Sequence, residues 1–230
     1  MKYQILREQT RHGTWQFPLA WYRMEGAEGF NVPLHWHEEV EILYLKQGDF
    51  RFSYNMQEET VQPPALLFFS PGAIHSLAAS GNPSASSLVF RLEMLEFSQN
   101  DEVQSGLLHP LSAGSLCFPR QIPSCHPCFS SALSVYQRAF DCAVAGSLAS
   151  RTALKAHLLE LISILAEHSL LSSASLESGI RPETLSNARL LLQYLNQHYA
   201  ERITAQDMAR LVGLNEQYFC RYFRRLFGQA

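Results

Sequence analysis

The chain has 230 residues, of which 47% are hydrophobic and 17% are charged, and this ordinary globular composition excludes an intrinsically disordered protein. This length allows a sizeable core and two small domains. No apolar run is long enough to cross a bilayer, and the N-terminal sequence MKYQILREQTRHG lacks the apolar segment of a secretion signal. We therefore expect a cytoplasmic protein without a membrane partner.

The formal net charge of −3 is unevenly distributed along the chain. Residues 1–181 carry 12 basic and 17 acidic side chains, whereas residues 182–230 carry 6 basic and 4 acidic ones. A basic C-terminal piece is expected if only that end meets a polyanion. The five cysteines have no framework spacing and fit a reducing compartment. The CHPC sequence at 125–128 resembles half of a zinc site, but nothing completes it, so we interpret its cysteines as unliganded loop thiols.

Between about residues 15 and 95, the sequence is typical of β-strands. Short runs rich in β-branched and aromatic residues alternate with turn sequences such as KQGD, SPGA and SGNPS. Strands at this spacing predict a small antiparallel barrel or sandwich. Residues 98–130 contain several prolines and predict an irregular connection.

After residue 130 the hydrophobic period becomes helical. One stripe is formed by Leu154, Leu158, Leu161 and Leu165. Such a stripe usually packs on its own domain, although adjacent helices here can also pair subunits. The serine-rich stretch 169–181 predicts a linker. An amphipathic helix then begins near Pro182, which a first helical turn tolerates. Its apolar positions are Leu185, Ala188, Leu192, Leu195 and Tyr199.

The segment LHWHEEVEILYLKQG, residues 34–48, places two histidines and a glutamate in a predicted buried strand. Because side chains alternate faces along a strand, His35, His37 and Glu41 share one face. The opposite face carries Trp36, Val40, Ile42 and Tyr44. Two imidazoles and a carboxylate form most of a divalent-metal site. His75, which follows the turn in SPGAIH, can supply a further ligand.

These residues resemble the two motifs of the cupin family. The first motif, G-x5-H-x-H-x3-E-x6-G, is matched at every position, by Gly29, His35, His37, Glu41 and Gly48. The core of the second motif, P-x-G-x2-H-x3-N, is matched by Gly72 and His75, whereas Ser70 and Ala79 replace its Pro and Asn. The resemblance implies a cupin-like (jelly-roll) antiparallel β-barrel over residues 1–98.

Two interpretations of this polar wall stay open. The side chains of His35, His37, Glu41 and His75 bind a divalent metal, or they hydrogen-bond a small effector or one another without an ion. Cupin domains of regulators resemble the cupin enzymes in fold yet often lack both metal and chemistry. We expect a small effector to bind in the lumen near these residues, with Trp36 or the N-terminal arm sensing it.

The basic C-terminal end predicts two helices joined by a short turn. Thr204 and Asp207 have the spacing of a capping box, which starts a helix at Ala205. Gly213 ends that helix, because glycine enters the left-handed conformation at little cost. Asn215 can cap the second helix.

The spacing of three residues makes this pair a predicted helix-turn-helix. Ala209 is small where crossed helices approach, Gly213 lies in the turn, and Phe219 fills the core between the helices. The apolar face of the second helix consists of Phe219, Tyr222, Phe223 and Leu226. The exposed positions, which can reach bases and phosphates, are Gln217, Cys220, Arg221, Arg224 and Arg225.

This stretch, including YFCRYFRRLFG, resembles the first helix-turn-helix of the AraC family of bacterial transcription regulators. The resemblance places Gln217, Cys220 and Arg221 at recognition-helix positions that face the major groove. Family members usually carry two such units, and this sequence ends at Ala230, just after the first. Because each well-read base pair contributes about 1–3 kcal/mol, we expect the chain alone to bind its operator weakly or not at all.

The order of the predicted parts leads to one functional prediction. Residues 1–98 form the effector barrel, 99–168 the connection and dimerisation helices, 169–181 the linker and 182–230 a partial DNA-binding domain. We predict an α+β, homodimeric, ligand-responsive transcription regulator and not an enzyme, with a sugar effector implied only by the family resemblance. One alternative is a metal-dependent cupin enzyme of the dioxygenase or isomerase type. Another is a protein that only oligomerises with full-length relatives.

Overall fold

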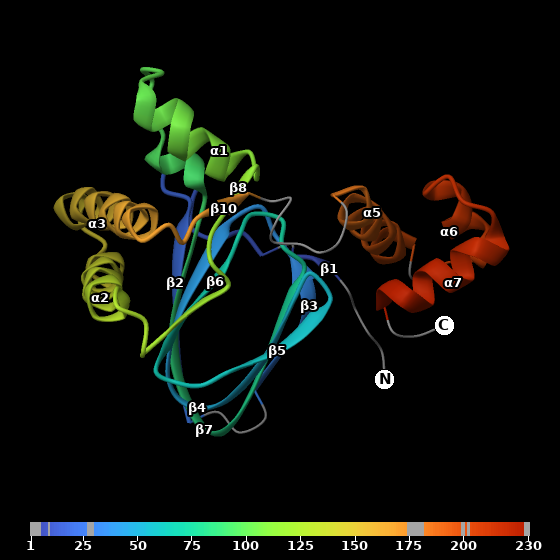
Figure 1. Cartoon of the computed structure of the whole chain (residues 1–230), viewed down its shortest axis with the longest axis horizontal. Helices are drawn as coiled ribbons and strands as arrows, with labels where there is room; N and C mark the ends of the chain where they lie inside the picture. The colour runs from blue at the N-terminus through green and yellow to red at the C-terminus, as the bar shows by residue number, and fades with distance from the viewer. Residues whose placement is uncertain are drawn as a thin grey trace.

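A computed structural model describes residues 6–8, 10–26, 30–173, 182–198, 201 and 203–227 (Figure 1). Within these residues, eight strands form one hydrogen-bonded sheet. The strands are β1 (Leu6–Arg7), β2 (Leu19–Glu25), β3 (Phe30–Trp36), β4 (Val40–Tyr54), β5 (Gln57–Val61), β6 (Ala65–Phe69), β7 (His75–Phe90) and β9 (Gln121–Pro123). The sheet-rich domain with helices that the sequence predicts is confirmed.

Two long strands, β4 and β7, pair with each other along almost their whole length. The other side of β7 pairs with β3 near its start and with β2 near its end. The strand order is β1-β3-β7-β4-β6-β9, with β5 paired to β4. Register shifts after Val32 and between Leu45 and Asp49 interrupt the regular ladders. Such irregularities bend strands, and the sheet is strongly curved in Figure 1.

The prediction of a closed barrel is wrong for the described strands. The strand path ends at β1, which pairs only with β3, and at β9, which pairs only with β6. Both are short, of two and three residues. No ladder of backbone hydrogen bonds joins these two end strands, so the described sheet is curved but not closed into a barrel.

The two faces of the sheet bury different residues because side chains alternate along each strand. On β4, Val40 and Ile42 belong to the apolar cluster that the helices cover, whereas Leu43 and Leu45 belong to the cluster inside the curved sheet. The prediction that Val40 and Ile42 lie on the face opposite the site is thus confirmed. This alternation gives the sheet a concave inner wall on which a site can be built.

Gly48 of the first motif lies where β4 and β7 approach closely. Its φ is +115°, and a Cβ atom there would lie 2.8 Å from the Cα atom of Pro83. No other residue fits without moving one of the two strands. Gly29, the first glycine of the motif, lies outside the described residues.

Helices α2 (Phe129–Ala145) and α3 (Leu148–Glu167) cover the convex face of the sheet (Figure 1). The predicted leucine stripe of α3 is buried in the same cluster as Ile42 and Phe68 of the sheet. These leucines therefore pack on their own sheet, the commoner of the two roles expected for them.

The segment from 92 to 123 is more ordered than the predicted irregular connection. It contains the 3-10 turn Leu92–Leu95, the π-helical turn Gln104–Leu108, helix α1 (His109–Ser112) and strand β8 (Leu116–Cys117). Part of the predicted linker is also ordered, because β10 (Ser172–Ser173) pairs with β8. Composition missed both features, since short strands gain their stability from a partner distant in sequence. Residues 174–181 of that linker lie outside the described residues.

Three helices follow, α5 (Pro182–His198), α6 (Ala205–Leu211) and α7 (Glu216–Phe227). The capping box between Thr204 and Asp207 is present in both directions and begins α6 as predicted. Gly213 follows α6 with a φ of +66°. Asn215 accepts a 2.8 Å hydrogen bond from the backbone N–H of Tyr218 and caps α7.

A small apolar core joins these three helices. It contains Leu191 of α5, Met208 and Ala209 of α6, and Phe219 and Tyr222 of α7. The predicted burial of Ala209 and Phe219 between the crossed helices is confirmed. Of the predicted stripe on α5, Ala188 is buried but belongs to a different cluster. The side chains of Leu185 and Leu192 and the whole of Tyr199 lie outside the description.

Helix α5 packs against the outside of the curved sheet, at the end of the molecule away from α2 and α3 (Figure 1). Ala188 shares an apolar cluster with Trp36 of β3 and Ile74, and Leu34 and Met56 pack against it. Trp36 therefore lies between the sheet and α5. Among the helices described, none is long and apolar enough to cross a membrane.

Candidate functional site

The histidine-rich segment 34–48 is two strands and not one. Strand β3 ends at Trp36, residues 38 and 39 form a bend, and β4 starts at Val40. The expectation that one continuous strand aligns His35, His37 and Glu41 is wrong. The side chains nevertheless gather, because β3 pairs His35 with His75, and β6, which pairs Phe69 with Glu41, leads through a short turn to His75.

The turn before β7 is tied to the bend before β4. The backbone N–H of Gly72 donates a 2.7 Å hydrogen bond to the carbonyl of His37. Ser70, which replaces the proline of the second motif, accepts a 3.2 Å hydrogen bond from the backbone N–H of Phe118. This departure from the motif thus anchors the loop before β9, and His75 still reaches the site.

The three motif histidines are held in the same way. In each ring the Nδ1 atom lies 2.9–3.0 Å from the carbonyl oxygen of a residue two positions away in sequence. This carbonyl accepts a hydrogen bond from the Nδ1–H group. The three acceptors are Pro33, Glu39 and Ala73. Because a carbonyl can only accept, the proton must be on Nδ1, which leaves the Nε2 lone pair of each neutral ring free.

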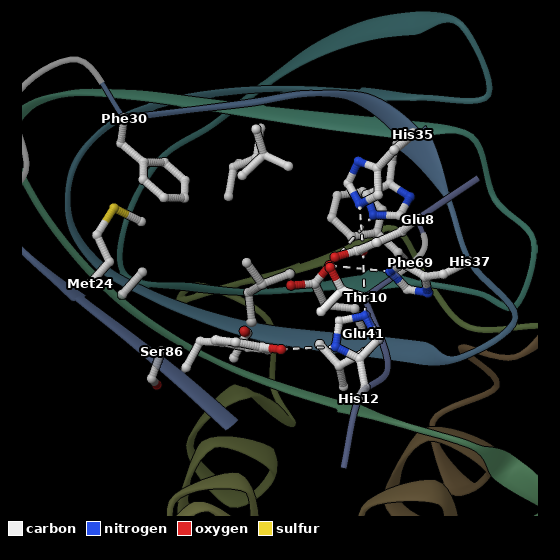
Figure 2. Close-up of a pocket in the computed structure, with 18 of the residues that line it drawn as sticks. Glu8, Thr10, His12, Met24, Phe30, His35, His37, Glu41, Phe69 and Ser86 are labelled. Carbon is white, nitrogen blue, oxygen red and sulfur yellow. Dashed lines mark hydrogen bonds and ion pairs between the residues drawn. The ribbon is translucent and has the colours of Figure 1, made fainter. Parts of the chain in front are cut away.

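The free nitrogens converge on a carboxylate (Figure 2). One potential ligand atom from each of His35, His37 and His75 lies within 4.8 Å of the others. The Oε2 atom of Glu41 lies 3.4 Å from Nε2 of His75 and 3.7 Å from Nε2 of His37. Phe69 stacks on the His75 ring, with the ring centroids 4.0 Å apart. The structure therefore brings together the four residues that the motifs single out.

The N-terminal segment adds residues that sequence reasoning did not identify. Strand β1 pairs with the end of β3, and the backbone N–H of Glu8 donates to the carbonyl of Trp36 at 3.0 Å. The Glu8 carboxylate then lies 3.5 Å from Nε2 of His35 and 3.3 Å from Nε2 of His12. His12 is buried, and its Nδ1 is 2.9 Å from the hydroxyl of Tyr22. No spacing in the sequence indicates these contacts, because they depend on a two-residue parallel pairing.

The electrostatics of the cluster favour ionised carboxylates. Burial raises the pKa of Glu41, but its contacts with His37 and His75, when these rings also carry a proton on Nε2, outweigh burial and hold this pKa well below its usual range. Burial likewise raises the pKa of Glu8, and its contact with His12 lowers the net value. Burial and the neighbouring His75 lower the pKa of His35 to about 4. Burial lowers the pKa of His37, but its contact with Glu41 gives a net rise.

These residues fit a divalent transition metal. Three imidazoles and a carboxylate are ligands of the type that iron, manganese and zinc bind. Backbone carbonyls that fix the Nδ1 proton are the usual outer-shell partners of metal-bound histidines. The buried Nε2 atoms of His37 and His75 accept no hydrogen bond from the described residues. The donor set, the tautomers and the orphaned nitrogens therefore agree.

The cluster forms one end of a cavity of about 450 Å³ inside the curved sheet. The cavity is also lined by Glu8, Tyr22, Phe30, Leu43 and Phe69. Trp36, which we expected to contact the effector, is not among the lining residues. It belongs instead to the cluster shared with Ala188 of α5. The reason is the alternation of β3, which directs His35 inward and Trp36 outward.

The CHPC sequence forms no metal cluster among the described residues. Cys125 is exposed and Cys128 is buried, and Nδ1 of His126 lies 3.1 Å from Sγ of Cys128. The group of potential metal ligands found in the described part of the chain is His35, His37 and His75.

The predicted DNA-contacting residues lie on one helix, α7. Gln217, Cys220, Arg221 and Arg224 are all exposed, while Phe219 and Tyr222 are buried on the opposite face. The side chains of Arg225 and Leu226 lie outside the description.

The fold and the site define a cupin-like ligand-binding domain joined to a helical C-terminal part. The family model of the AraC-like ligand-binding domain matches residues 22–181, most of the chain. The chain belongs to this family and is an AraC-family regulator with a cupin-like N-terminal domain.

Two curated relatives come from Bacillus subtilis strain 168, and both are named uncharacterized HTH-type transcriptional regulators. YdeC is 23% identical over 236 residues, covering 99% of this chain and 77% of the relative. YbfI is 23% identical over 210 residues, covering 90% of this chain and 70% of the relative.

Similar solved structures match about a third of the chain. Bacillus subtilis oxalate decarboxylase is 30% identical over 31% of this chain and 20% of its own, with a TM-score of 0.28. A cupin superfamily protein from Desulfitobacterium hafniense is 15% identical over 34% of this chain and 71% of its own, with a TM-score of 0.31.

Proposed function

We propose that this protein is a cytoplasmic, sequence-specific DNA-binding transcription regulator that responds to a small effector bound in the cavity of its curved sheet. The observation that carries the proposal is the physical continuity of its two parts. His35 and His75 line the cavity, and the residues next to them in sequence, Trp36 and Ile74, pack against Ala188 of α5. We therefore expect a change at the cluster to reach α5 through this direct packing contact.

The effector half of the proposal is supported by the cavity. Its volume of about 450 Å³ lies in the range of small-molecule sites, and it combines apolar walls with a few convergent polar groups. An effector that binds one arrangement of β3, β7 and α5 better than another will shift the population of that arrangement.

The DNA half is supported by the geometry of α6 and α7. The capping box, the left-handed Gly213 and the buried Ala209 and Phe219 form two crossed helices with a tight turn. Helix α7 then exposes Gln217 and Arg221 for base edges and Arg224 for phosphates.

A second proposed property is a divalent metal at His35, His37, Glu41 and His75. The observation that favours it is the common orientation of the three rings, each with Nδ1 bound to a carbonyl and Nε2 directed at the cluster. When bound, such an ion supplies a Lewis acid and an attachment point for an anionic ligand. Metal analysis of the purified protein, and calorimetric titration of chelator-treated protein with Zn²⁺ and Mn²⁺, test this property.

The regulator proposal is tested by selection from a random-sequence DNA library at low salt, where weak contacts survive. We expect one motif to be enriched by the wild-type chain and lost with Arg221→Ala, while Arg51→Ala on strand β4 serves as an exposed arginine control. Failure to enrich any sequence over beads alone would reject the proposal.

The alternative of a metal-dependent cupin enzyme makes a different prediction. Stoichiometric metal together with turnover in a substrate screen, and no sequence enriched from the library, would favour it. A protein that only forms mixed oligomers with relatives would likewise enrich no sequence, and it would lower reporter output when co-expressed with a full-length relative.

Homodimerisation through α2 and α3 is also part of the proposal. Val144 is 45% exposed and Leu148 is 84% exposed at the turn between these helices. Exposed apolar side chains that are contiguous often mark protein contacts. Analytical ultracentrifugation of the wild type and Leu148→Glu measures the effect of the substitution on dimerisation. If the two proteins have the same molecular mass at every concentration, this dimer surface is rejected.

A further inference from the structure

The cavity is divided along its length into a polar and an apolar end. On the β3–β7 ladder, His35 pairs with His75 at one end, Val32 pairs with Leu77 further along, and Phe30 lies at the other end. Five residues of strand place Phe30 about 16 Å from His35, at about 3.3 Å per residue. Figure 2 shows Phe30 and Met24 together at the end away from the histidines.

The apolar end offers almost no hydrogen-bonding partner. Its walls are formed by Met24, Phe30, Val32, Leu43, Leu77 and Ala85. Two serines of β7 line the cavity: the hydroxyl of Ser86 lies 3.0 Å from that of Tyr136 and is directed at helix α2, whereas Ser87 lies opposite Leu43, between Ala85 at the apolar end and Val89 beside Glu41. Arg23 is turned the same way, with its guanidinium 5.4 Å from the ring centroid of Phe140. A ligand hydroxyl placed here would lose its hydrogen bonds to water without replacement.

The opposite end of the cavity is polar and, unlike the apolar end, presents groups that accept hydrogen bonds. It presents the carboxylates of Glu8 and Glu41 together with the Nε2 atoms of His35 and His75. Without a metal, this end carries negative charge and favours a cationic group. With a divalent ion on the three histidines, the same end favours an anionic group that can coordinate the ion.

We infer that the effector is an amphipathic small molecule with one charged head, bound at the histidine cluster, and an apolar body bound between Phe30 and Leu77. The inference rests on the proposed function, because it names the chemical class of the proposed effector. It replaces the sugar implied by the family resemblance, since a polyhydroxylated ligand would place several hydroxyl groups against apolar walls.

The test is a chain-length series measured by isothermal titration calorimetry. The chelator-treated protein is titrated with primary amines from butylamine to octylamine, and the Zn²⁺-loaded protein with carboxylates from butanoate to octanoate. In the series whose head group is accepted, we expect the dissociation constant to fall about fourfold per added methylene, the effect of burying one CH₂ group. Equal affinities along both series, binding by neither series, or tighter binding of arabinose or glucose would overturn the inference.

Two variants locate the apolar body in the cavity. Val32→Thr and Met24→Gln keep the size of partly buried side chains and add a polar group to the apolar end. We expect each to weaken the octyl compound at least threefold and to leave the butyl compound almost unchanged. Asn31→Thr, at the exposed neighbouring position of β3, is the control. Equal weakening by this control would contradict the assignment.

The failure of this inference can be told apart from failure of the proposed function. A length dependence lost in Val32→Thr supports the assignment of the apolar end, even if no DNA sequence is enriched from the library. Enrichment of a DNA motif without any length dependence rejects the amphipathic effector and leaves the regulator proposal intact.

Discussion

His35 and Trp36 are consecutive residues of β3 that lie on opposite faces of the sheet. The His35 ring joins the polar cluster inside the cavity, and Trp36 joins the apolar cluster that contains Ala188 of α5. Ile74 and His75 repeat this relationship at the start of β7. At both places, two consecutive residues join the cavity on one side to the packing surface of α5 on the other.

This contact predicts that α5 can be separated from the sheet by one substitution. Ala188 is completely buried, so Ala188→Leu overpacks the cluster, which costs about 1–3 kcal/mol. We expect faster proteolysis between the sheet and α5, with the thermal transition of the sheet nearly unchanged. Ser186→Leu, at an exposed position of the same helix, is the control. Equal protease resistance of the wild type and Ala188→Leu would contradict the contact.

Glu8 predicts that the N-terminal strand contributes to metal affinity. Its carboxylate lies 3.5 Å from Nε2 of His35, one of the proposed ligands. Because Nε2 is the proposed ligating atom of His35, this carboxylate faces the ion site itself, and its negative charge attracts a divalent cation. We expect Glu8→Gln to weaken Zn²⁺ binding by about tenfold in a competition assay with a chromogenic chelator. Glu58→Gln, exposed on β5, should leave the affinity unchanged, and an unaffected Glu8→Gln protein would refute the role.

His75 provides the corresponding test of the metal site itself. The ring is buried, and its Nε2 atom accepts no hydrogen bond from the described residues. We expect His75→Ala to abolish detectable Zn²⁺ binding in calorimetry. His157→Ala on α3 serves as the control, since that ring lies 3.2 Å from Glu160 and away from the cavity. Retention of wild-type affinity by His75→Ala would exclude the proposed ligand set.

The capping box predicts a local effect on the C-terminal helices. Thr204 accepts a hydrogen bond from the backbone N–H of Asp207, and the Asp207 carboxylate accepts one from the backbone N–H of Thr204. Thr204→Ala removes one half of the box and is expected to cost about 0.5–2 kcal/mol. Hydrogen exchange should show faster opening of α6, while Thr184→Ala within α5 should leave α6 unaffected. Unchanged exchange in α6 would mean that packing alone holds this helix.

Local chemistry made several features readable from the sequence. The capping box, the turn glycine Gly213 and the spacing of Ala209 and Phe219 predicted α6 and α7. The motif spacing from Gly29 to Gly48 predicted a cupin-like sheet and selected His35, His37 and Glu41. The helix starts and ends and the strand-rich region could be predicted because caps, turns and side-chain periodicity depend on residues close together in the sequence.

Tertiary contacts decided the remaining features. The open sheet, the entry of Glu8 and His12 into the site, the placement of Trp36 against α5 and the apolar end of the cavity all arise from pairings between distant segments. Such pairings leave no periodic signal, because each contact is made by a few residues whose partners are set by the curvature of the whole sheet. The sequence by itself determined the strands, the helices and the positions of the motif histidines, and the fold decided which of these side chains share a wall.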